Sequence, residues 1–195
     1  MKRFACLIIC MLAGMTFGLP PAFAAPTDPL PGDSLYQLAV PLTDHDGAER
    51  TLDDLRGKVV VVSMFYTTCP YMCPLIIDTV RQSERALDDA QRARLSVLLV
   101  SLDAKRDDPG RLKAQLTQRK LDGARWTLAR TDAAHVRKLA AALGIQYREL
   151  DDGEFNHSSV LILLDRDGRI VARTETMGKT DPAFIDALKQ QLAQP

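Results

Sequence analysis

From Lys58 to Tyr66 the chain reads KVVVVSMFY, a nearly unbroken apolar run rich in β-branched residues. A run of this kind is typical of a central parallel strand that is covered on both faces. It continues into TTCPYMCP, residues 67–74, and the apolar residues from Leu75 to Leu87 then follow a helical spacing. The sequence predicts a buried strand, a loop with two cysteines and a helix. Because sites in α/β sheets form beyond the carboxyl ends of strands, this loop is the first candidate site.

Further strands and helices are expected on both sides of this unit. The expected strands are 35–40, 58–66, 95–102, 159–164 and 169–175, and the expected helices begin after Pro74, at Pro109 (through Leu121), after Asp132 (stopping at Gly144) and at Asp181-Pro182. Turns are expected at Asp44-His45-Asp46-Gly47 and, within a hairpin, at Asp165-Arg166-Asp167-Gly168. Strands that alternate with helices and end in a hairpin and a helix predict an α/β sandwich with a mixed central sheet.

The first residues have the features of an export signal. Lys2 and Arg3 precede an apolar run over 4–19, and small residues stand around Ala24. We expect a signal peptide over 1–24 that is cleaved after Ala24, a proline-rich linker over 25–33, and one domain over 34–195. A retained membrane anchor is the alternative, although the run is shorter than the roughly 20 residues that a spanning helix needs. A lipoprotein cysteine at Cys10 is disfavoured because bulky Ile9 precedes it.

The composition, 46% hydrophobic and 26% charged, is that of an ordinary globular domain. Cleavage of the leader would remove two of the four cysteines and two of the 25 basic residues, leaving 23 basic against 25 acidic residues, a net charge near −2. The mature chain then has no excess of basic residues, so its charge does not suggest a nucleic-acid partner. The remaining cysteines, Cys69 and Cys73, would lie in an oxidising compartment, where a working dithiol needs dedicated reduction.

Cys69 and Cys73 are four residues apart, which places both sulfurs on one side of a helical turn. Pro74 fits the first helical position, and the nearby helix N-terminus favours thiolates. A purely structural disulfide would close a loop too short to stabilise the fold much. Two thiolates alone fit either a redox pair or a metal site.

A third ligand would distinguish these two kinds of site. His45 in an acidic turn and His135 near the start of an exposed helix are expected to be solvated surface residues. His157 stands directly before a buried strand and is a candidate ligand. Two thiolates and an imidazole suit Cu(I) and can also hold Cu(II), whereas a closed structural zinc site needs four protein ligands. Met64 is expected in the core, and the role of Met72 stays open.

Several blocks of the sequence resemble the Sco/SenC family. They are Leu42-Thr43-Asp44, Leu55-Arg56-Gly57-Lys58, Phe65 to Pro74, Val100-Ser101-Leu102-Asp103 with Arg106-Asp107, and Asn156-His157-Ser158 before Leu164-Asp165-Arg166-Asp167-Gly168. Together they cover about residues 34 to 190 in the order of the family. The family's D-P-x-R-D reads Asp103-Ala104-Lys105-Arg106-Asp107 here, and its D-H-S reads Asn156-His157-Ser158.

The resemblance implies a thioredoxin-like fold with an N-terminal β extension. It implies that Cys69, Cys73 and His157 bind copper, as Cu(I) or Cu(II), and that Asp103 lies near them as an outer residue. It also implies delivery of copper to the binuclear centre of cytochrome c oxidase. The expected partner is the copper-receiving oxidase subunit or another copper chaperone at the membrane surface, and the protein itself is expected to be a periplasmic monomer.

The main alternative is an enzyme, a periplasmic thiol-disulfide oxidoreductase with Cys69 as nucleophile and Cys73 as resolving thiol. Thioredoxin-type oxidoreductases usually have C-x-x-C and a later cis-proline loop, whereas this chain has three residues between its cysteines and Asn156-His157 before the later strand. Both activities can coexist, because loading copper can require reduction of the partner's cysteines. A peroxiredoxin is disfavoured, since Tyr66 stands where that class has Thr or Ser.

Overall fold

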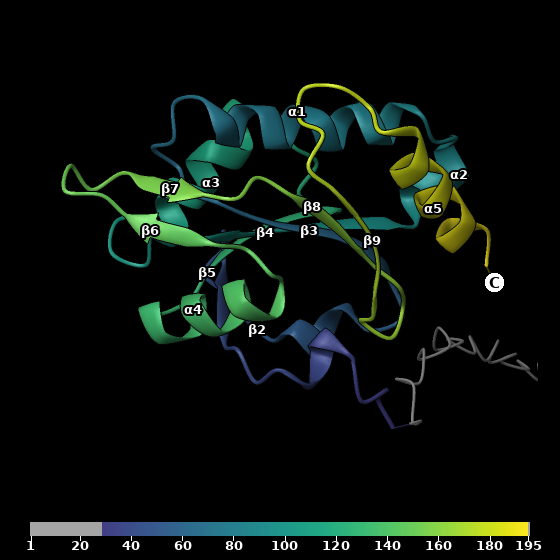
Figure 1. Cartoon of the computed structure of the whole chain (residues 1–195), viewed down its shortest axis with the longest axis horizontal. Helices are drawn as coiled ribbons and strands as arrows, with labels where there is room; N and C mark the ends of the chain where they lie inside the picture. The colour runs from purple at the N-terminus through teal and green to yellow at the C-terminus, as the bar shows by residue number, and fades with distance from the viewer. Residues whose placement is uncertain (1–28, 195) are drawn as a thin grey trace, which may run out of the picture.

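The computed structural model describes residues 29–194, which form a seven-stranded mixed sheet, a separate two-stranded sheet and the helices around them (Figure 1). The strands are β1 Leu42–Asp44, β2 Glu49–Arg50, β3 Val59–Phe65, β4 Leu95–Ser101, β5 Trp126–Arg130, β6 Tyr147–Glu149, β7 Phe155–His157, β8 Leu161–Leu164 and β9 Ile170–Thr174. The helices are η1 Leu35–Gln37, η2 Leu52–Leu55, α1 Met72–Arg85, α2 Asp89–Ala93, α3 Pro109–Gln118, α4 Ala133–Ala142 and α5 Pro182–Ala193. The large sheet has the order β2-β1-β5-β4-β3-β8-β9.

Strand β3 lies inside this sheet, and all seven of its residues are buried. It runs parallel to β4 and antiparallel to β8, with Val61 opposite Val97 on one side and Leu163 on the other. In Figure 1 helix α1 lies above the sheet and α4 below it. The predicted central strand and the mixed sheet flanked by helices are therefore confirmed, because side chains on both faces of β3 find apolar cover.

The predicted helix starts at Pro109, Asp132 and Asp181 are confirmed. The Asp132 and Asp181 carboxylates cap α4 and α5 by accepting backbone N–H groups of the first turn, and Pro109 opens α3. Gly144, where α4 was expected to stop, has φ +62°, a left-handed conformation that glycine adopts without strain. These short-range signals predict helix ends well because their partners lie within a few residues.

Three predictions about element bounds are wrong. Residues 35–40 do not form a strand: the Ser34 side chain accepts the N–H of Tyr36 and starts the short helix η1 instead. Helix α1 begins at Met72, so Pro74 is its third residue rather than its first. Helix α3 ends at Gln118, before Leu121, because Lys120 takes a left-handed conformation with φ 51°.

Neither strand β5 nor the hairpin of β6 and β7 was predicted from the sequence. Strand β5 lies between β1 and β4 in the large sheet. The hairpin of β6 and β7 pairs only with itself, with Tyr147 opposite His157 and Glu149 opposite Phe155. The hairpin strands are only three residues long and have no buried residue, so they lack an apolar pattern that would reveal them.

The predicted signal peptide over 1–24 lies outside the described residues. Of the expected linker, residues 29–33 are described, and they contact the domain: Leu30 packs against the core and the Asp33 carboxylate lies 2.8 Å from Nε of Arg169. Among residues 29–194, no helix combines the length and the apolar character that are needed to cross a membrane.

Candidate metal centre

The end of β3 and the start of α1 position the two cysteines. Cys69 lies in the loop that follows β3, and Cys73 lies in the first turn of α1 and is 1% exposed. The backbone N–H of Cys73 donates to Sγ of Cys69 at 3.3 Å, and the N–H of Tyr66 donates to Sγ of Cys73 at 3.4 Å. Pro74 costs the helix nothing at its third position, since the N–H groups of a first turn have no intrahelical partner. Backbone donors thus hold both sulfurs close together.

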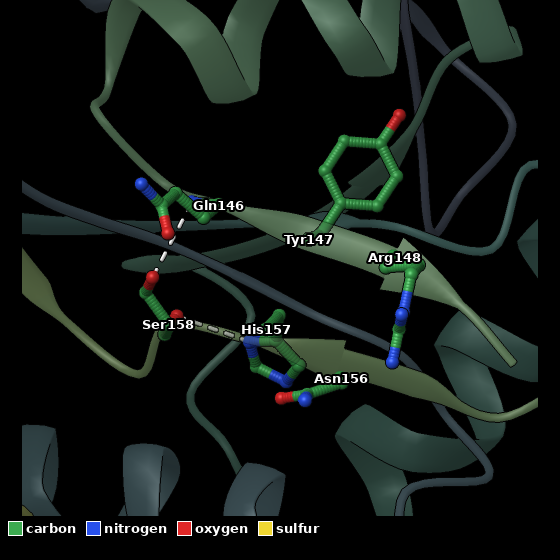
Figure 2. A pocket seen from close by; sticks show the side chains of 6 residues that line it. All are labelled: Gln146, Tyr147, Arg148, Asn156, His157 and Ser158. Atoms are coloured by element: carbon green, nitrogen blue, oxygen red, sulfur yellow. Dashed lines mark hydrogen bonds between the residues drawn. The ribbon is translucent and has the colours of Figure 1, made fainter.

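His157 reaches the site from the last position of β7 (Figure 2). Its Nδ1 lies 3.1 Å from the backbone oxygen of Ser158, and because a carbonyl only accepts, Nδ1 carries the proton. The other ring nitrogen, Nε2, is buried and has no hydrogen-bond partner within the described residues. In a neutral imidazole protonated at Nδ1, Nε2 offers a lone pair, which is the form that binds a metal.

The fold brings these three side chains together, as a copper site requires. Figure 1 shows the β6–β7 hairpin and the loop between β3 and α1 at the same end of the molecule. One ligand atom each from Cys69, Cys73 and His157 lies within 4.8 Å of the others, and within residues 29–194 no other group of three Cys, His, Asp or Glu side chains comes this close. Both cysteines are free thiols. Two soft sulfurs and one imidazole nitrogen without a partner fit copper.

The two sulfurs differ in their acidity. The hydrogen bond from the Cys73 thiol is the main cause that lowers the pKa of Cys69 to about 3; burial opposes it, and the backbone N–H groups of Cys73 and Tyr71 assist it. The same hydrogen bond, together with burial, raises the pKa of Cys73. The pair therefore shares one proton at neutral pH, with Cys69 as the thiolate.

A cavity of about 280 Å³ opens onto the site. It is lined by Tyr66, Cys69, Pro70, Tyr71, Met72, Glu154, Phe155, Asn156 and His157. Tyr71 is 78% exposed at its rim, and Met72, whose role the sequence left open, is half-exposed there. Met64, by contrast, is fully buried, so its predicted place in the core is confirmed.

A second cavity of about 430 Å³ lies over the hairpin, between Gln146, Tyr147 and Arg148 on one side and Asn156, His157 and Ser158 on the other (Figure 2).

Tyr66 joins the two halves of the site, a role that the sequence analysis did not assign. Its hydroxyl lies 3.0 Å from the Glu154 carboxylate on the hairpin. Its ring packs edge-on against Phe155 and His157, with centroid distances of 5.2 and 6.0 Å. Burial is the main cause that raises the pKa of Tyr66, so the phenol stays protonated and donates to Glu154. The place of this aromatic residue directly before the cysteine loop was the feature of the sequence that could have indicated its role.

Asp107 holds the start of the cysteine loop in place through hydrogen bonds. It is 1% exposed, and its carboxylate accepts the backbone N–H of Thr67 at 2.9 Å and the hydroxyl groups of Thr67 and Ser101. Asp107 belongs to the D-A-K-R-D block, residues 103–107, but its contact with the cysteine loop was not predicted from the sequence. A buried carboxylate needs such donors, because an unpaired charge in the interior is costly.

Asp103 lies in the same block, but the contacts of its carboxylate go elsewhere. It is 2% exposed, accepts the N–H groups of Lys105 and Arg106, and forms an ion pair with the Arg106 guanidinium. None of its described hydrogen bonds involves Cys69, Cys73 or His157. Asp103 is therefore linked to the candidate ligands only indirectly, through Arg106 and through the segment that carries Asp107.

The other two histidines do not belong to the ligand group. His45 was expected at the surface, and this is wrong: it is 6% exposed, its Nδ1 accepts the N–H of Leu128 at 3.3 Å, and its Nε2 lies 3.4 Å from the Asp46 carboxylate. Packing against β5 buries a ring that its acidic neighbours suggested was solvated. His135 lies on helix α4 and contacts the Asp132 carboxylate at 2.6 Å.

Comparison with known proteins supports the same family that the sequence blocks indicated. A putative copper-binding protein of Stutzerimonas stutzeri is 24% identical over 157 residues, 78% of this chain and 73% of that protein. The mitochondrial protein SCO2 of Saccharomyces cerevisiae is 33% identical over 76 residues, 39% of this chain, and the match spans only a quarter of that protein's length. The structure of Bradyrhizobium japonicum ScoI with copper bound superimposes with a TM-score of 0.66 at 25% identity, covering 78% of this chain and 96% of that one.

The fold is thus the thioredoxin-like fold of the Sco structures. The family model SCO1/SenC matches residues 33–193, nearly all of the part that the structure describes. Because the matched region contains both cysteines, the distant histidine and every strand and long helix of the fold, we conclude that the chain is a member of the SCO1/SenC family.

Proposed function

We propose that this chain binds one copper ion through Sγ of Cys69, Sγ of Cys73 and Nε2 of His157. The observation that carries the proposal is the buried Nε2 without a hydrogen-bond partner, next to two free sulfurs. A buried polar atom left without a partner costs free energy unless a ligand satisfies it. The copper bound to the similar ScoI structure supports the choice of metal.

Binding copper also requires a proton to leave. Cys69 is already a thiolate, whereas the pKa of Cys73 is raised, so the proton that the pair shares must be released when both sulfurs bind the metal. Copper binding is therefore expected to strengthen as the pH rises. A site in which both cysteines were already thiolates would release no proton, and its copper affinity would not show this dependence on pH.

We infer that the copper is cargo rather than a permanent cofactor. The chain acts in the periplasm, and it passes the ion to the copper-receiving subunit of cytochrome c oxidase or to another chaperone at the membrane surface. Family membership supports this role. The cavity beside Cys69 and His157 supports it as well, because a ligand from a partner can approach the ion from that side.

Titration of the reduced protein with Cu(I) and Cu(II), followed by competition with chelators of known affinity, tests the ligand set. Wild type is expected to bind one equivalent of either ion. His157→Ala should lose Cu(II), because an imidazole suits that ion and two thiolates alone do not complete its coordination, but it should retain Cu(I).

His135→Ala is the matched control, since it removes a histidine that hydrogen-bonds to Asp132 at the start of α4 and does not belong to the ligand group. It should bind both ions like wild type. If His157→Ala also binds both ions as tightly as wild type, the ligand assignment is wrong. Copper content of the oxidase in cells with and without this protein then tests delivery separately.

One observation, the acidity of Cys69, favours a second function, which is thiol-disulfide exchange. In this reaction the Cys69 thiolate attacks a partner's disulfide and forms a mixed disulfide. Cys73 then loses its proton and attacks Sγ of Cys69, which releases the reduced partner and leaves a Cys69–Cys73 disulfide. This chain is oxidised by two electrons and must be reduced again by another dithiol. His157→Ala should retain this exchange, so the two functions separate experimentally.

A further inference from the structure

The position of His157 depends on side-chain contacts rather than on the main sheet. Strands β6 and β7 pair with each other, and neither joins the seven-stranded sheet. An isolated two-stranded hairpin is only marginally stable in water. Contacts with the rest of the domain must therefore fix where the imidazole lies relative to the sulfurs.

Arg106 supplies a central set of these contacts. Its Nε pairs with the Asp103 carboxylate, its Nη2 donates to the backbone oxygen of Gly153 in the hairpin turn, and its Nη1 lies 3.9 Å from Glu154. Gly153 has φ +81°, and a Cβ there would lie only 3.4 Å from Nη1 of Arg106, so the guanidinium packs closely against the turn. Asp103 is almost fully buried and is held by two backbone N–H groups. The guanidinium thus links a rigid carboxylate to the turn before His157.

The segment that carries Arg106 also holds the cysteine loop. Asp107 follows Arg106 directly, and it accepts the N–H of Thr67 two residues before Cys69. The five residues 103–107 therefore contact both ligand-bearing elements, through Arg106 on the hairpin side and through Asp107 on the cysteine side. A shift of Arg106 would move the hairpin relative to the sulfurs while the cysteine loop stays in place.

We propose that Arg106 is a positioning residue that sets the place of the His157 ring relative to Cys69 and Cys73. This inference rests on the proposed copper site, and it adds that the affinity for Cu(II) depends on a guanidinium that does not touch the ion. Partners that orient metal ligands typically change metal affinity about 10- to 100-fold when they are lost. The effect falls on Cu(II), because two thiolates still hold Cu(I) without the imidazole.

Arg106→Lys is the informative variant. The ammonium group still neutralises buried Asp103, which protects the fold, but one nitrogen cannot span Asp103, Gly153 and Glu154 as the guanidinium does. Cu(II) affinity should fall about tenfold, and Cu(I) affinity by clearly less. Lys105→Ala is the matched control: Lys105 pairs with Glu149 on the same hairpin, but the pair is exposed, so both affinities should stay within about twofold.

A double-mutant cycle with His157→Ala separates positioning from general destabilisation. Measured with Cu(I), Arg106→Lys should have no further effect once His157 is absent, because the residue through which it acts is gone. If Arg106→Lys weakens Cu(I) binding equally in both backgrounds, or leaves Cu(II) affinity unchanged, the proposal is overturned.

Amide hydrogen exchange of the copper-free protein provides a readout that needs no metal. Arg106→Lys should speed exchange in residues 147–157 and leave β3 and β4 unchanged. Unchanged exchange in the hairpin contradicts the proposal. If wild type itself fails to bind copper, the proposed function falls while the exchange experiment still decides whether Arg106 holds the hairpin.

Discussion

The cysteine loop and the β6–β7 hairpin carry parts of the same site but are held in different ways. The loop continues from fully buried β3 into α1, whose residues Ile76, Ile77 and Val80 are completely buried. The hairpin is half-buried at best and is attached through Tyr66, Arg106 and their partners. Cys73 is therefore part of the core and Cys69 packs against it, whereas the imidazole is brought to the two sulfurs by peripheral contacts. Binding that needs only the sulfurs should be robust, and binding that needs the ring should be sensitive to the hairpin.

The largest expected difference concerns stability. Phe65→Ala removes a fully buried ring at the end of β3, and the cavity should cost about 3–5 kcal/mol of the free energy of unfolding. Phe155→Ala on β7 removes a half-buried ring that packs on Tyr66, and should cost only about 1–2 kcal/mol. Urea unfolding of the copper-free proteins measures both values. Equal losses would show that the hairpin belongs to the core as much as β3 does.

The next largest effect is expected for the loss of one sulfur. If the roughly 10–16 kcal/mol of a structural zinc site is spread over four ligands, one ligand is worth about 3 kcal/mol, or about two orders of magnitude in affinity. Cys73→Ser should therefore weaken both Cu(I) and Cu(II) about 100-fold, unlike His157→Ala, which affects mainly Cu(II). Competition titration measures both ions.

Met72→Leu is the control for this variant, because it changes the half-exposed neighbour of Cys73 at nearly constant size. It should leave both affinities unchanged. A selective loss of Cu(I) affinity in Met72→Leu would add a thioether to the ligand set and would contradict a site of three ligands.

The smallest expected effect is the pH dependence of Cys69 alkylation. Because the pKa of Cys69 is lowered to about 3, its reaction with iodoacetamide should be nearly independent of pH between about pH 5 and 8, whereas an ordinary thiol reacts about tenfold faster per pH unit there. The lowered pKa stabilises the folded state fully only above the ordinary thiol pKa, and this contribution decreases as the pH falls toward 3.

Rates of labelling at Cys69 in two variants show which side of the site causes this acidity. The flat profile should persist in His157→Ala, because the Cys73 thiol is the main cause. It should steepen in Cys73→Ser, whose hydroxyl is a weaker partner for the thiolate. If the profile steepens in His157→Ala and stays flat in Cys73→Ser, the acidity of Cys69 depends on the hairpin. The contrast between the two regions would then be lost.

Local patterns predicted much of the fold. The apolar run of β3, the helical spacing after Cys73 and the caps Asp132 and Asp181 all act over a few residues, and the structure has each of them. The strand β5 escaped prediction because Thr127 and Arg130 break its apolar character, and it is a strand because it pairs with β4. The wrong expectation for His45 has the same origin, since its burial depends on Leu128 from β5.

By itself, the sequence determined the central strand, the neighbouring pair Cys69 and Cys73, and the candidacy of His157 as a distant third ligand. Only the tertiary structure decided that the imidazole reaches the sulfurs, because 84 residues separate His157 from Cys73 and no local preference spans that distance. The contacts of Tyr66, Arg106 and Asp107 join the two halves. Each of them links segments far apart in the chain, so their energies are defined only once the sheet and the hairpin have come together.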